Sequence, residues 1–186
     1  MRIISGGAKG VVLSPPARTV RPTTDRVKES MFAILGDLQE RIVVDLFAGS
    51  GALGLEALSR GAAAVYLVEN QARNCRLIER NAAKVVKSCG RKDSAHVIRG
   101  DVMRAPQILA AVRPDVILAD PPYHPGPGEK GAVDLLQSSD FAEWAGSAML
   151  VLEQSVHNRL AEGATGEWEV FREKTYGDTV LYFLRR

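Results

Sequence analysis

The chain has 186 residues, 46% of them apolar and 25% charged, which is typical of one soluble globular domain. No apolar run is long enough to span a membrane, and the N-terminus lacks the apolar core of a secretory signal peptide, so we expect a cytoplasmic protein without membrane contact. Cys75 and Cys89 have neither a metal-binding spacing nor a disulfide framework, which predicts free thiols and no metal site.

The N-terminal residues 1–20 are predicted to form a small extension. Two short apolar runs flank a glycine-rich turn, which predicts a β-hairpin. A helix is then expected over about residues 22–36, with Thr23 or Thr24 as its N-cap. We therefore expect two parts, an N-terminal hairpin extension over residues 1–20 and a main domain over residues 21–186.

Strands and helices alternate through the rest of the chain. Apolar segments predict five strands, over residues 42–47, 64–68, 96–99, 116–119 and 148–153. Periodic segments predict helices over residues 52–60, 72–88, 106–112, 132–137 and 156–161. Two last strands are predicted over residues 167–174 and 179–184, joined by a hairpin turn. This alternation indicates an α/β fold with a parallel, doubly wound sheet, to which the last hairpin adds an antiparallel edge.

A glycine-rich turn lies between the first predicted strand and the helix that follows it. The run Gly49-Ser50-Gly51-Ala52-Leu53-Gly54 fits the pattern G-x-G-x-x-G, and Glu69 closes the next strand 20 residues after Gly49. In dinucleotide-type sites, such glycines let the backbone approach the ligand, and the acidic side chain binds ribose hydroxyls. This pattern alone fits both NAD and S-adenosylmethionine.

Two carboxylates favour S-adenosylmethionine over NAD. Asp45 lies inside the first strand, where its charge suits the cationic amino group of a methionine moiety and would repel a pyrophosphate. Asp101 follows the third strand and can accept a hydrogen bond from an adenine amino group. An aspartate in that position is also a common helix N-cap.

The motif Asp120-Pro121-Pro122-Tyr123 follows the fourth predicted strand, which lies beside the first strand at the topological switch of such a sheet. The prolines have no backbone N–H, so their carbonyls and the Asp120 carboxylate form a cluster of hydrogen-bond acceptors. These acceptors can orient an exocyclic amine of a nucleic-acid base for attack on a methyl group. Tyr123 offers a ring on which an extruded base can stack. A Pro-Pro turn alone would explain the motif, but not its place downstream of the glycine turn.

Basic residues are concentrated in two segments of a chain whose net charge is only +2. Residues 1–30 carry six basic and two acidic side chains, and residues 71–92 carry seven basic and one acidic. In the second segment, spacings of three and four place most of them on one helix face: Arg73, Arg76, Arg80, Lys84, Lys87 and Arg91. This basic stripe and Lys9 in the hairpin are candidates for contact with a nucleic acid, although a solvated helix face would show the same spacing.

Three segments together resemble a known family: residues 21–32 (RPTTDRVKESMF), residues 45–57 (DLFAGSGALGLEA) and residues 120–123 (DPPY). They are similar to the bacterial RsmD-type methyltransferases, which modify guanine N2 in 16S ribosomal RNA, and the resemblance extends from Arg2 to Asp178. The glycine motif and Asp-Pro-Pro-Tyr occur in several other methyltransferases. The Arg-Pro-Thr segment is the more specific element.

The resemblance implies a Rossmann-like class I S-adenosylmethionine-dependent methyltransferase with a seven-stranded, mostly parallel sheet and an N-terminal β-hairpin. It implies that the residues that contact S-adenosylmethionine are Thr23, Thr24, Asp45, Phe47, Ala48, Gly49, Ser50, Gly51, Glu69, Asp101 and Asp120. Together with the charge pattern, it makes the candidate RNA contacts Lys9, Arg21, Arg26, Arg73, Arg76, Arg80 and Lys84. The implied partner is 16S ribosomal RNA within an assembling small subunit, and we expect a monomer. The hairpin carries fewer basic residues than is usual in the family, which shifts the expected RNA contact toward the stripe.

Four other functions compete with this interpretation. An N6-adenine DNA methyltransferase would need the same acceptors, but a chain of 186 residues has no room for a separate target-recognition domain. A protein-glutamine methyltransferase more often has Asn in place of Asp120. A non-catalytic RNA-binding assembly factor would have no need for Asp120 and Glu69. An NAD-dependent oxidoreductase is disfavoured by Asp45 and by the Asp-Pro-Pro-Tyr motif.

Overall fold

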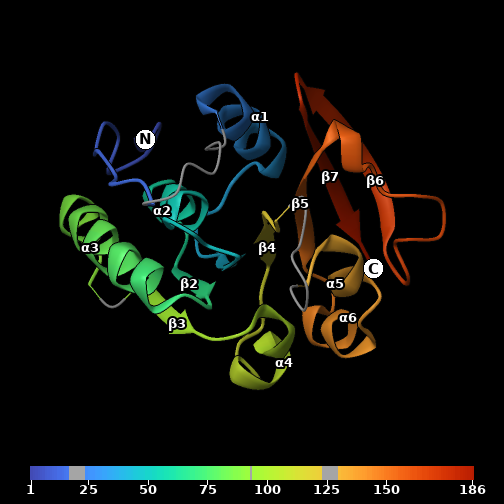
Figure 1. Ribbon diagram of the computed structural model, residues 1–186. Coiled ribbons are helices and arrows are strands. Elements are labelled where there is room, and N and C mark those ends of the chain that lie inside the picture. Colours follow the sequence, from blue (N-terminus) through green and yellow to red (C-terminus); the bar gives the residue numbers. More distant parts are fainter. Residues whose placement is uncertain (17–23, 93, 123–129) are drawn as a thin grey trace.

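A seven-stranded sheet with the strand order β3-β2-β1-β4-β5-β7-β6 forms the centre of the computed structural model (Figure 1). The structure describes residues 1–16, 24–92, 94–122 and 130–186. The strands are β1 (Ile42–Leu46), β2 (Ala64–Glu69), β3 (Ala95–Arg99), β4 (Val116–Ala119), β5 (Met149–Ser155), β6 (Glu169–Tyr176) and β7 (Thr179–Arg185). The strands β1 to β5 are parallel, whereas β7 is antiparallel to both β5 and β6, so the predicted α/β class and its antiparallel C-terminal edge are confirmed.

Helices cover both faces of this sheet. The α-helices are α1 (Asp25–Leu35), α2 (Ala52–Ser59), α3 (Ala72–Cys89), α4 (Ala105–Ile108), α5 (Ala132–Leu136) and α6 (Ser139–Ala145). Two 3₁₀ turns are η1 (Val102–Arg104) and η2 (Val156–Asn158). Figure 1 shows α1, α2 and α3 on one face and α4, α5 and α6 on the other. Among the described residues, no helix combines the length and the apolar character that a membrane span requires.

Alternate residues of each strand supply two separate cores. On β1, Val43 packs with the residues beneath α1 to α3, while Val44 and Leu46 belong to the core beneath α4 to α6. Because side chains alternate along a strand, Asp45 lies on the same face as Val43, among the helices α1 to α3. The fully buried central strands explain why the sequence shows continuous apolar runs there instead of an alternating pattern.

Three helical predictions differ from the structure, and in one of them the helix predicted over residues 106–112 ends at Ile108 as α4. Helix α6 has no predicted counterpart; the Ser138 side chain accepts a hydrogen bond from Phe141 N (3.3 Å) and caps it, and Phe141, Ala142 and Ala145 are its buried residues. Its seven residues are too few to show a helical period of their own. The helix predicted over residues 156–161 is reduced to the single 3₁₀ turn η2.

The N-terminal arm, residues 1–14, folds back on itself as an antiparallel loop. Ile3 N donates to Val11 O (3.0 Å), and Gly10 N donates to Ile3 O (2.9 Å). The loop has the direction of the predicted hairpin, but it holds one isolated bridge, Arg2 to Val12, instead of two strands. The boundary predicted at residue 20 lies outside the described residues, so the division into two parts remains a prediction.

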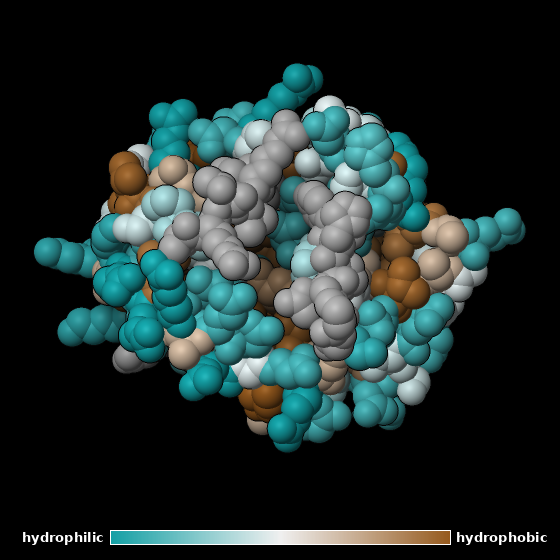
Figure 2. Space-filling model, in the orientation of Figure 1, coloured by the Kyte–Doolittle hydropathy of each residue, from teal (hydrophilic) through white to brown (hydrophobic). Residues whose placement is uncertain are grey.

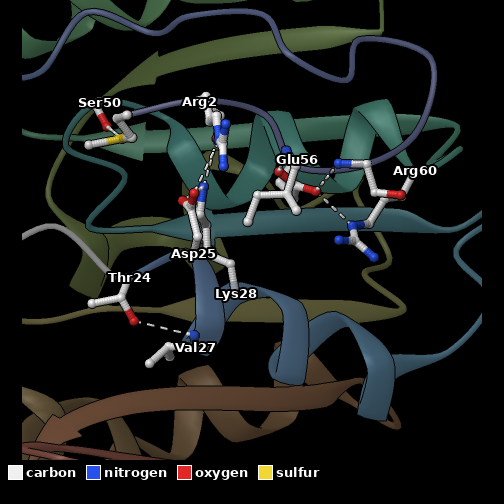
Figure 3. A network of polar contacts seen from close by, with 11 residues as sticks. Arg2, Thr24, Asp25, Val27, Lys28, Ser50, Glu56 and Arg60 are labelled. Carbon is white, nitrogen blue, oxygen red and sulfur yellow. Dashed lines mark hydrogen bonds and ion pairs between the residues drawn. The ribbon is translucent and has the colours of Figure 1, made fainter.

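Buried side chains attach the N-terminal arm to the main domain. Ile3, Ala8 and Leu13 are buried in the core beneath α1 to α3. The buried Glu56 carboxylate on α2 accepts hydrogen bonds from the N–H groups of two arm residues, Ile4 (2.8 Å) and Ser5 (3.1 Å), and Arg60 donates to it as well (Figure 3).

A second buried charge holds the same arm from α1. Lys28 is 0% exposed, and its Nζ donates to Arg2 O (2.8 Å). Burying a charge is costly unless it is hydrogen-bonded, and both Lys28 and Glu56 use arm backbone groups for that purpose. The arm is therefore part of the packed structure on this side of the molecule.

The packing of two glycines in the arm predicts how their substitution affects stability. A Cβ built on Gly6 would lie 1.8 Å from Ser59 O, whereas one on Gly10 meets nothing within 4 Å, and both residues have a positive φ. Each Gly→Ala change should lower the free energy of unfolding by about 1 kcal/mol, because alanine is strained in the left-handed backbone conformation. Gly6→Ala should lower the free energy of unfolding by about 2 kcal/mol more, because the arm must move off α2. Denaturant unfolding of the two variants measures the difference, and equal losses would contradict this packing.

Candidate active site

Three parallel strands bring the acidic residues predicted for the site to one edge of the sheet. Leu46 of β1 lies in register with Val68 of β2 and Ala119 of β4. Glu69 and Asp120 each follow one of these register partners, and the loop of residues 47–51 leaves β1 at the same edge. The predicted position of the β4 motif beside β1 is therefore correct.

The loop between β1 and α2 reverses direction through left-handed backbone. Phe47, Gly49 and Gly51 have φ values of 60°, 56° and 78°. The conformation at Phe47 was not evident from the sequence, because residues other than glycine rarely adopt it. Gly51 N donates to Ala48 O (2.6 Å), which closes the turn just before α2 begins at Ala52.

Asp45 joins β1 to the first turn of α2. It is 2% exposed, and its Oδ2 accepts a hydrogen bond from Gly54 N at 2.8 Å. A Cβ on Gly54 would lie 3.0 Å from Asp45 Cβ, so a glycine allows this close approach. Burial raises the pKa of Asp45 from 3.8 to about 7; the Gly54 bond opposes this rise, and the charge of Glu69 adds to it. A cationic group beside Asp45 would favour the ionised form and lower this pKa again.

Glu69 anchors the glycine loop to the end of β2. Its Oε2 accepts from Gly49 N (2.9 Å) and its Oε1 from Gln71 N (2.8 Å). Each carboxylate oxygen has two lone pairs, so these bonds leave capacity to accept hydroxyl groups of a ligand. The sequence indicated a ligand contact for Glu69, but not that the same carboxylate holds the loop.

Asp120 lies in an acidic environment. Burial raises the pKa of Asp120 well above its usual value, and the nearby carboxylates of Glu153 and Asp45 raise it further. Ala119 and Leu152 are register partners, so Asp120 and Glu153 follow at the same level of adjacent strands. Glu153 is a buried member of the site that the sequence analysis missed. Its only signal was an acidic residue within the apolar run of β5.

Two other residues that were predicted to contact the cofactor, Asp101 and Thr24, act as N-caps. Asp101 is exposed and acts as the N-cap of η1, since its Oδ1 accepts from Met103 N (2.9 Å). Thr24 caps α1 by accepting from Val27 N (3.4 Å; Figure 3). Both residues thus have a structural role, and the contact of either with a ligand stays a prediction. Thr23 and Tyr123 lie outside the described residues.

The basic stripe on α3 lies on the outer surface. Its members Arg73, Arg76, Arg80, Lys84 and Lys87 are exposed, as are the two other RNA-contact candidates Lys9 and Arg26. Hydrophilic side chains cover the side of the molecule on which α3 lies (Figure 2). Arg91 does not extend the stripe as predicted, because its guanidinium donates to Gly61 O (3.0 Å) and Ala62 O (2.8 Å) beyond α2. The last RNA-contact candidate, Arg21, lies outside the described residues.

Comparison with known proteins agrees with this arrangement. The family described as Conserved hypothetical protein 95 matches residues 1–185. The Ribosomal RNA small subunit methyltransferase D of Escherichia coli strain K12 is 33% identical over 190 residues, covering 100% of this chain and 90% of that protein. The chain belongs to the RsmD-type methyltransferase family. The resemblance found in its three segments is therefore confirmed.

Solved structures show how the fold of this family relates to others. The hypothetical protein TTHA0928 of Thermus thermophilus is 28% identical, with a TM-score of 0.73 and coverage of 100% of this chain and 99% of that chain. SMU.776, solved in complex with SAH, is 11% identical, with a TM-score of 0.62 and coverage of 87% of this chain and 48% of that chain. At that identity the second likeness concerns the fold alone, and it is the Rossmann-like fold of class I methyltransferases.

The raised pKa of Asp45 predicts a pH-dependent loss of stability. Between pH 3.8 and about 7 the folded protein keeps a proton that the unfolded chain has released, so stability falls as the pH rises. The change from 3.8 to about 7 corresponds to at most about 4 kcal/mol. Asp45→Asn, which cannot ionise, should therefore gain stability relative to the wild type across this range.

Denaturant unfolding at a series of pH values measures this difference. The exposed change Glu143→Gln on α6 serves as the control and should follow the wild type. A constant difference between Asp45→Asn and the wild type from pH 4 to pH 8 would contradict the assignment.

Proposed function

We propose that the chain transfers a methyl group from S-adenosylmethionine to the exocyclic N2 of a guanine in 16S ribosomal RNA during assembly of the small subunit in the cytoplasm. The observation that carries this proposal is the position of Asp120-Pro121-Pro122 at the end of β4, beside the glycine loop that follows β1. Relatives that share the whole chain bear the name Ribosomal RNA small subunit methyltransferase D, which supports ribosomal RNA as the substrate.

The residues at the sheet edge suit S-adenosylmethionine. The buried Asp45 carboxyl suits its cationic amino group, Glu69 its ribose hydroxyls, and Asp101 its adenine amino group. The backbone at Gly49 and Gly51 can approach the ligand closely because neither residue has a side chain. Thr23 and Thr24 complete the proposed contacts. When bound, S-adenosylmethionine supplies an electrophilic methyl group.

Asp120 is the proposed catalytic residue, together with the carbonyls of Pro121 and Pro122. Their oxygens accept the N–H groups of the guanine amine, which orients its lone pair toward the methyl carbon. Methyl transfer would form the N–C bond as the methyl C–S bond breaks, with S-adenosylhomocysteine as the leaving group. The nitrogen would then carry the positive charge and lose its proton to Asp120 or to water. The raised pKa of Asp120 makes its carboxylate a stronger base than an ordinary aspartate. We propose that Tyr123 stacks on the extruded base.

The exposed stripe on α3 is the proposed phosphate-binding surface. Five basic side chains on one helix face provide positive charge that attracts a nucleic-acid backbone. We propose that residues 1–20 act as an RNA-facing extension of a methyltransferase domain formed by residues 21–186, and that one monomer binds one assembling particle.

A direct assay tests the function. The protein is incubated with S-adenosylmethionine and unmodified small-subunit particles, free 16S ribosomal RNA or duplex DNA, and the digested nucleosides are identified by mass spectrometry. We expect N2-methylguanosine from the particles, with less from free RNA. N6-methyladenine from DNA, or no methylated nucleoside from any substrate, would overturn the proposal.

The proposed catalytic role of Asp120 predicts that its substitution lowers the rate of methyl transfer much more than the affinity for the cofactor. Asp120→Asn keeps the shape of the side chain but loses its charge and its capacity as proton acceptor. We expect methyl transfer to fall by about two to three orders of magnitude, as when one preorganised group is removed. The affinity for S-adenosylhomocysteine, measured by calorimetry, should stay within about tenfold of the wild type, because Asn keeps the size of the side chain and Asp120 is one cofactor contact among many. Unchanged turnover would exclude Asp120 from the reaction.

If the stripe binds phosphates, removal of its charges should lower both the RNA affinity and the salt dependence of that affinity. The double variant Arg76→Ala/Arg80→Ala should weaken particle binding and lower the slope of log affinity against log salt by about 1 to 2, since two phosphate contacts are lost. The charge-matched control Arg172→Ala/Lys174→Ala, on the exposed edge strand β6, should keep the wild-type slope. Filter binding over a range of salt concentrations measures both. Equal slopes for the two variants would place the RNA elsewhere.

A further inference from the structure

Asn81 links the N-terminal arm to the glycine loop. It lies on α3 and is 0% exposed. Its Oδ1 accepts from Ser14 N (2.9 Å), and its Nδ2 donates both to Ser14 O (3.1 Å) and to Ser50 O (3.0 Å). One side-chain amide thus binds both backbone groups of an arm residue and one carbonyl of the loop.

The bond to Ser50 affects the geometry of the loop. Ser50 O belongs to the peptide unit that also contains Gly51 N, so fixing the direction of this carbonyl fixes the direction of that N–H. The loop is held from β2 as well, where Glu69 accepts from Gly49 N (2.9 Å). Asn81 and Glu69 therefore hold the two sides of the Gly49–Gly51 turn.

A second contact joins the arm to the same residue. The Ser50 hydroxyl donates to Met1 Sδ (3.3 Å). The arm is also attached to α2 through Glu56 and to α1 through Lys28. Since Ser14 and Met1 belong to the arm, a displacement of the arm would change their positions relative to Ser50.

The arm also presents a surface next to the basic stripe. Val12 is 68% exposed, and the stripe residue Lys84 donates to Val12 O (3.3 Å). A polyanion bound along α3 would therefore contact the arm two residues from Ser14. A series of contacts then leads to the loop, through Lys84, Val12, Ser14, Asn81 and Ser50.

We propose that Asn81 is a positioning residue that couples RNA contact at the arm and α3 to the conformation of the loop that binds the methyl donor. This inference rests on the proposed function. RNA bound to the arm favours the loop conformation that accepts S-adenosylmethionine, and the methyl donor by the same linkage strengthens RNA binding. The enzyme thereby binds its methyl donor more tightly when its substrate is in place.

Two variants and a matched control test the coupling. Asn81→Leu removes all three bonds at nearly the same side-chain volume. Asn81→Asp keeps the acceptor for Ser14 N and loses the donor to both carbonyls. The control Ser88→Ala removes another bond between α3 and the arm, Ser88 Oγ to Gly7 O (3.2 Å), which does not reach Ser50.

The measurement is the dissociation constant of S-adenosylhomocysteine with and without saturating unmodified small-subunit particles. For the wild type and Ser88→Ala we expect binding at least about fivefold tighter with particles, the lower range of measured allosteric couplings. For Asn81→Leu and Asn81→Asp this ratio should fall to within about twofold of one. A general loss of stability affects both members of the ratio, so a merely structural role of Asn81 would leave the ratio unchanged. A wild-type ratio near one, or an unchanged ratio in folded Asn81 variants, would overturn the inference.

Hydrogen exchange on the wild type provides a test that needs no variant. Pro15 and Pro16 have no amide hydrogen, so a peptide that ends there reports on Ser14 N, which donates to Asn81. We expect saturating S-adenosylhomocysteine to slow exchange in this peptide, and unchanged exchange would contradict the coupling. Failure of the proposed function gives a different result, because the wild type would then bind no S-adenosylhomocysteine or methylate no RNA.

Discussion

The site depends on the buried hydrogen bond between Asp45 and Gly54 N. This bond joins β1 to the first turn of α2 across 2.8 Å, so the loop between them must reverse direction within a fixed span. Left-handed residues at Phe47, Gly49 and Gly51 achieve this reversal. The carboxylate that makes the bond loses its hydration, and a single backbone N–H offsets that loss only in part, which is why the pKa of Asp45 rises to about 7. The geometry of the loop and the electrostatics of the site therefore have one cause.

The acidic residues at the sheet edge make the isolated protein less stable than it would otherwise be. Asp45 and Glu153 raise the pKa of Asp120, and Glu69 raises that of Asp45, so the carboxyl groups disfavour each other's ionisation. Groups that carry positive charge or donate hydrogen bonds would relieve this repulsion. In the proposed reaction, the amino group of the methyl donor and the amine of the base are such groups. Part of the cost that the acidic cluster imposes on folding is thus recovered when ligands bind, as is common at functional sites.

Features that depend on local pattern could be predicted from the sequence, whereas contacts between distant segments could not. Strand β4 has its predicted bounds because four apolar residues are followed by Asp120 and a proline pair, and the glycine turn was recognised by its spacing to Glu69. The two parts of the candidate site could therefore be placed from the sequence. The structural uses of Lys28, Glu56 and Asn81 could not, since each binds backbone groups that lie 26 or more residues away. Helical periodicity assigned Arg91 to the stripe, but the end of α3 at Gly90 turns it toward Gly61 instead.

Three buried side chains hold the N-terminal arm through its backbone. The bonds from Glu56, Lys28 and Asn81 all go to backbone N–H or C=O groups of the arm, so they constrain its path and not its exposed side chains. An arm held in this manner can act through its position as well as through its charge. Lys9 at the turn is exposed, and the neighbouring helix α3 exposes five basic side chains. In the proposed coupling, helix α3 attracts the polyanion by its charge. The arm, which is anchored through its backbone, transmits the contact to the loop at Ser50.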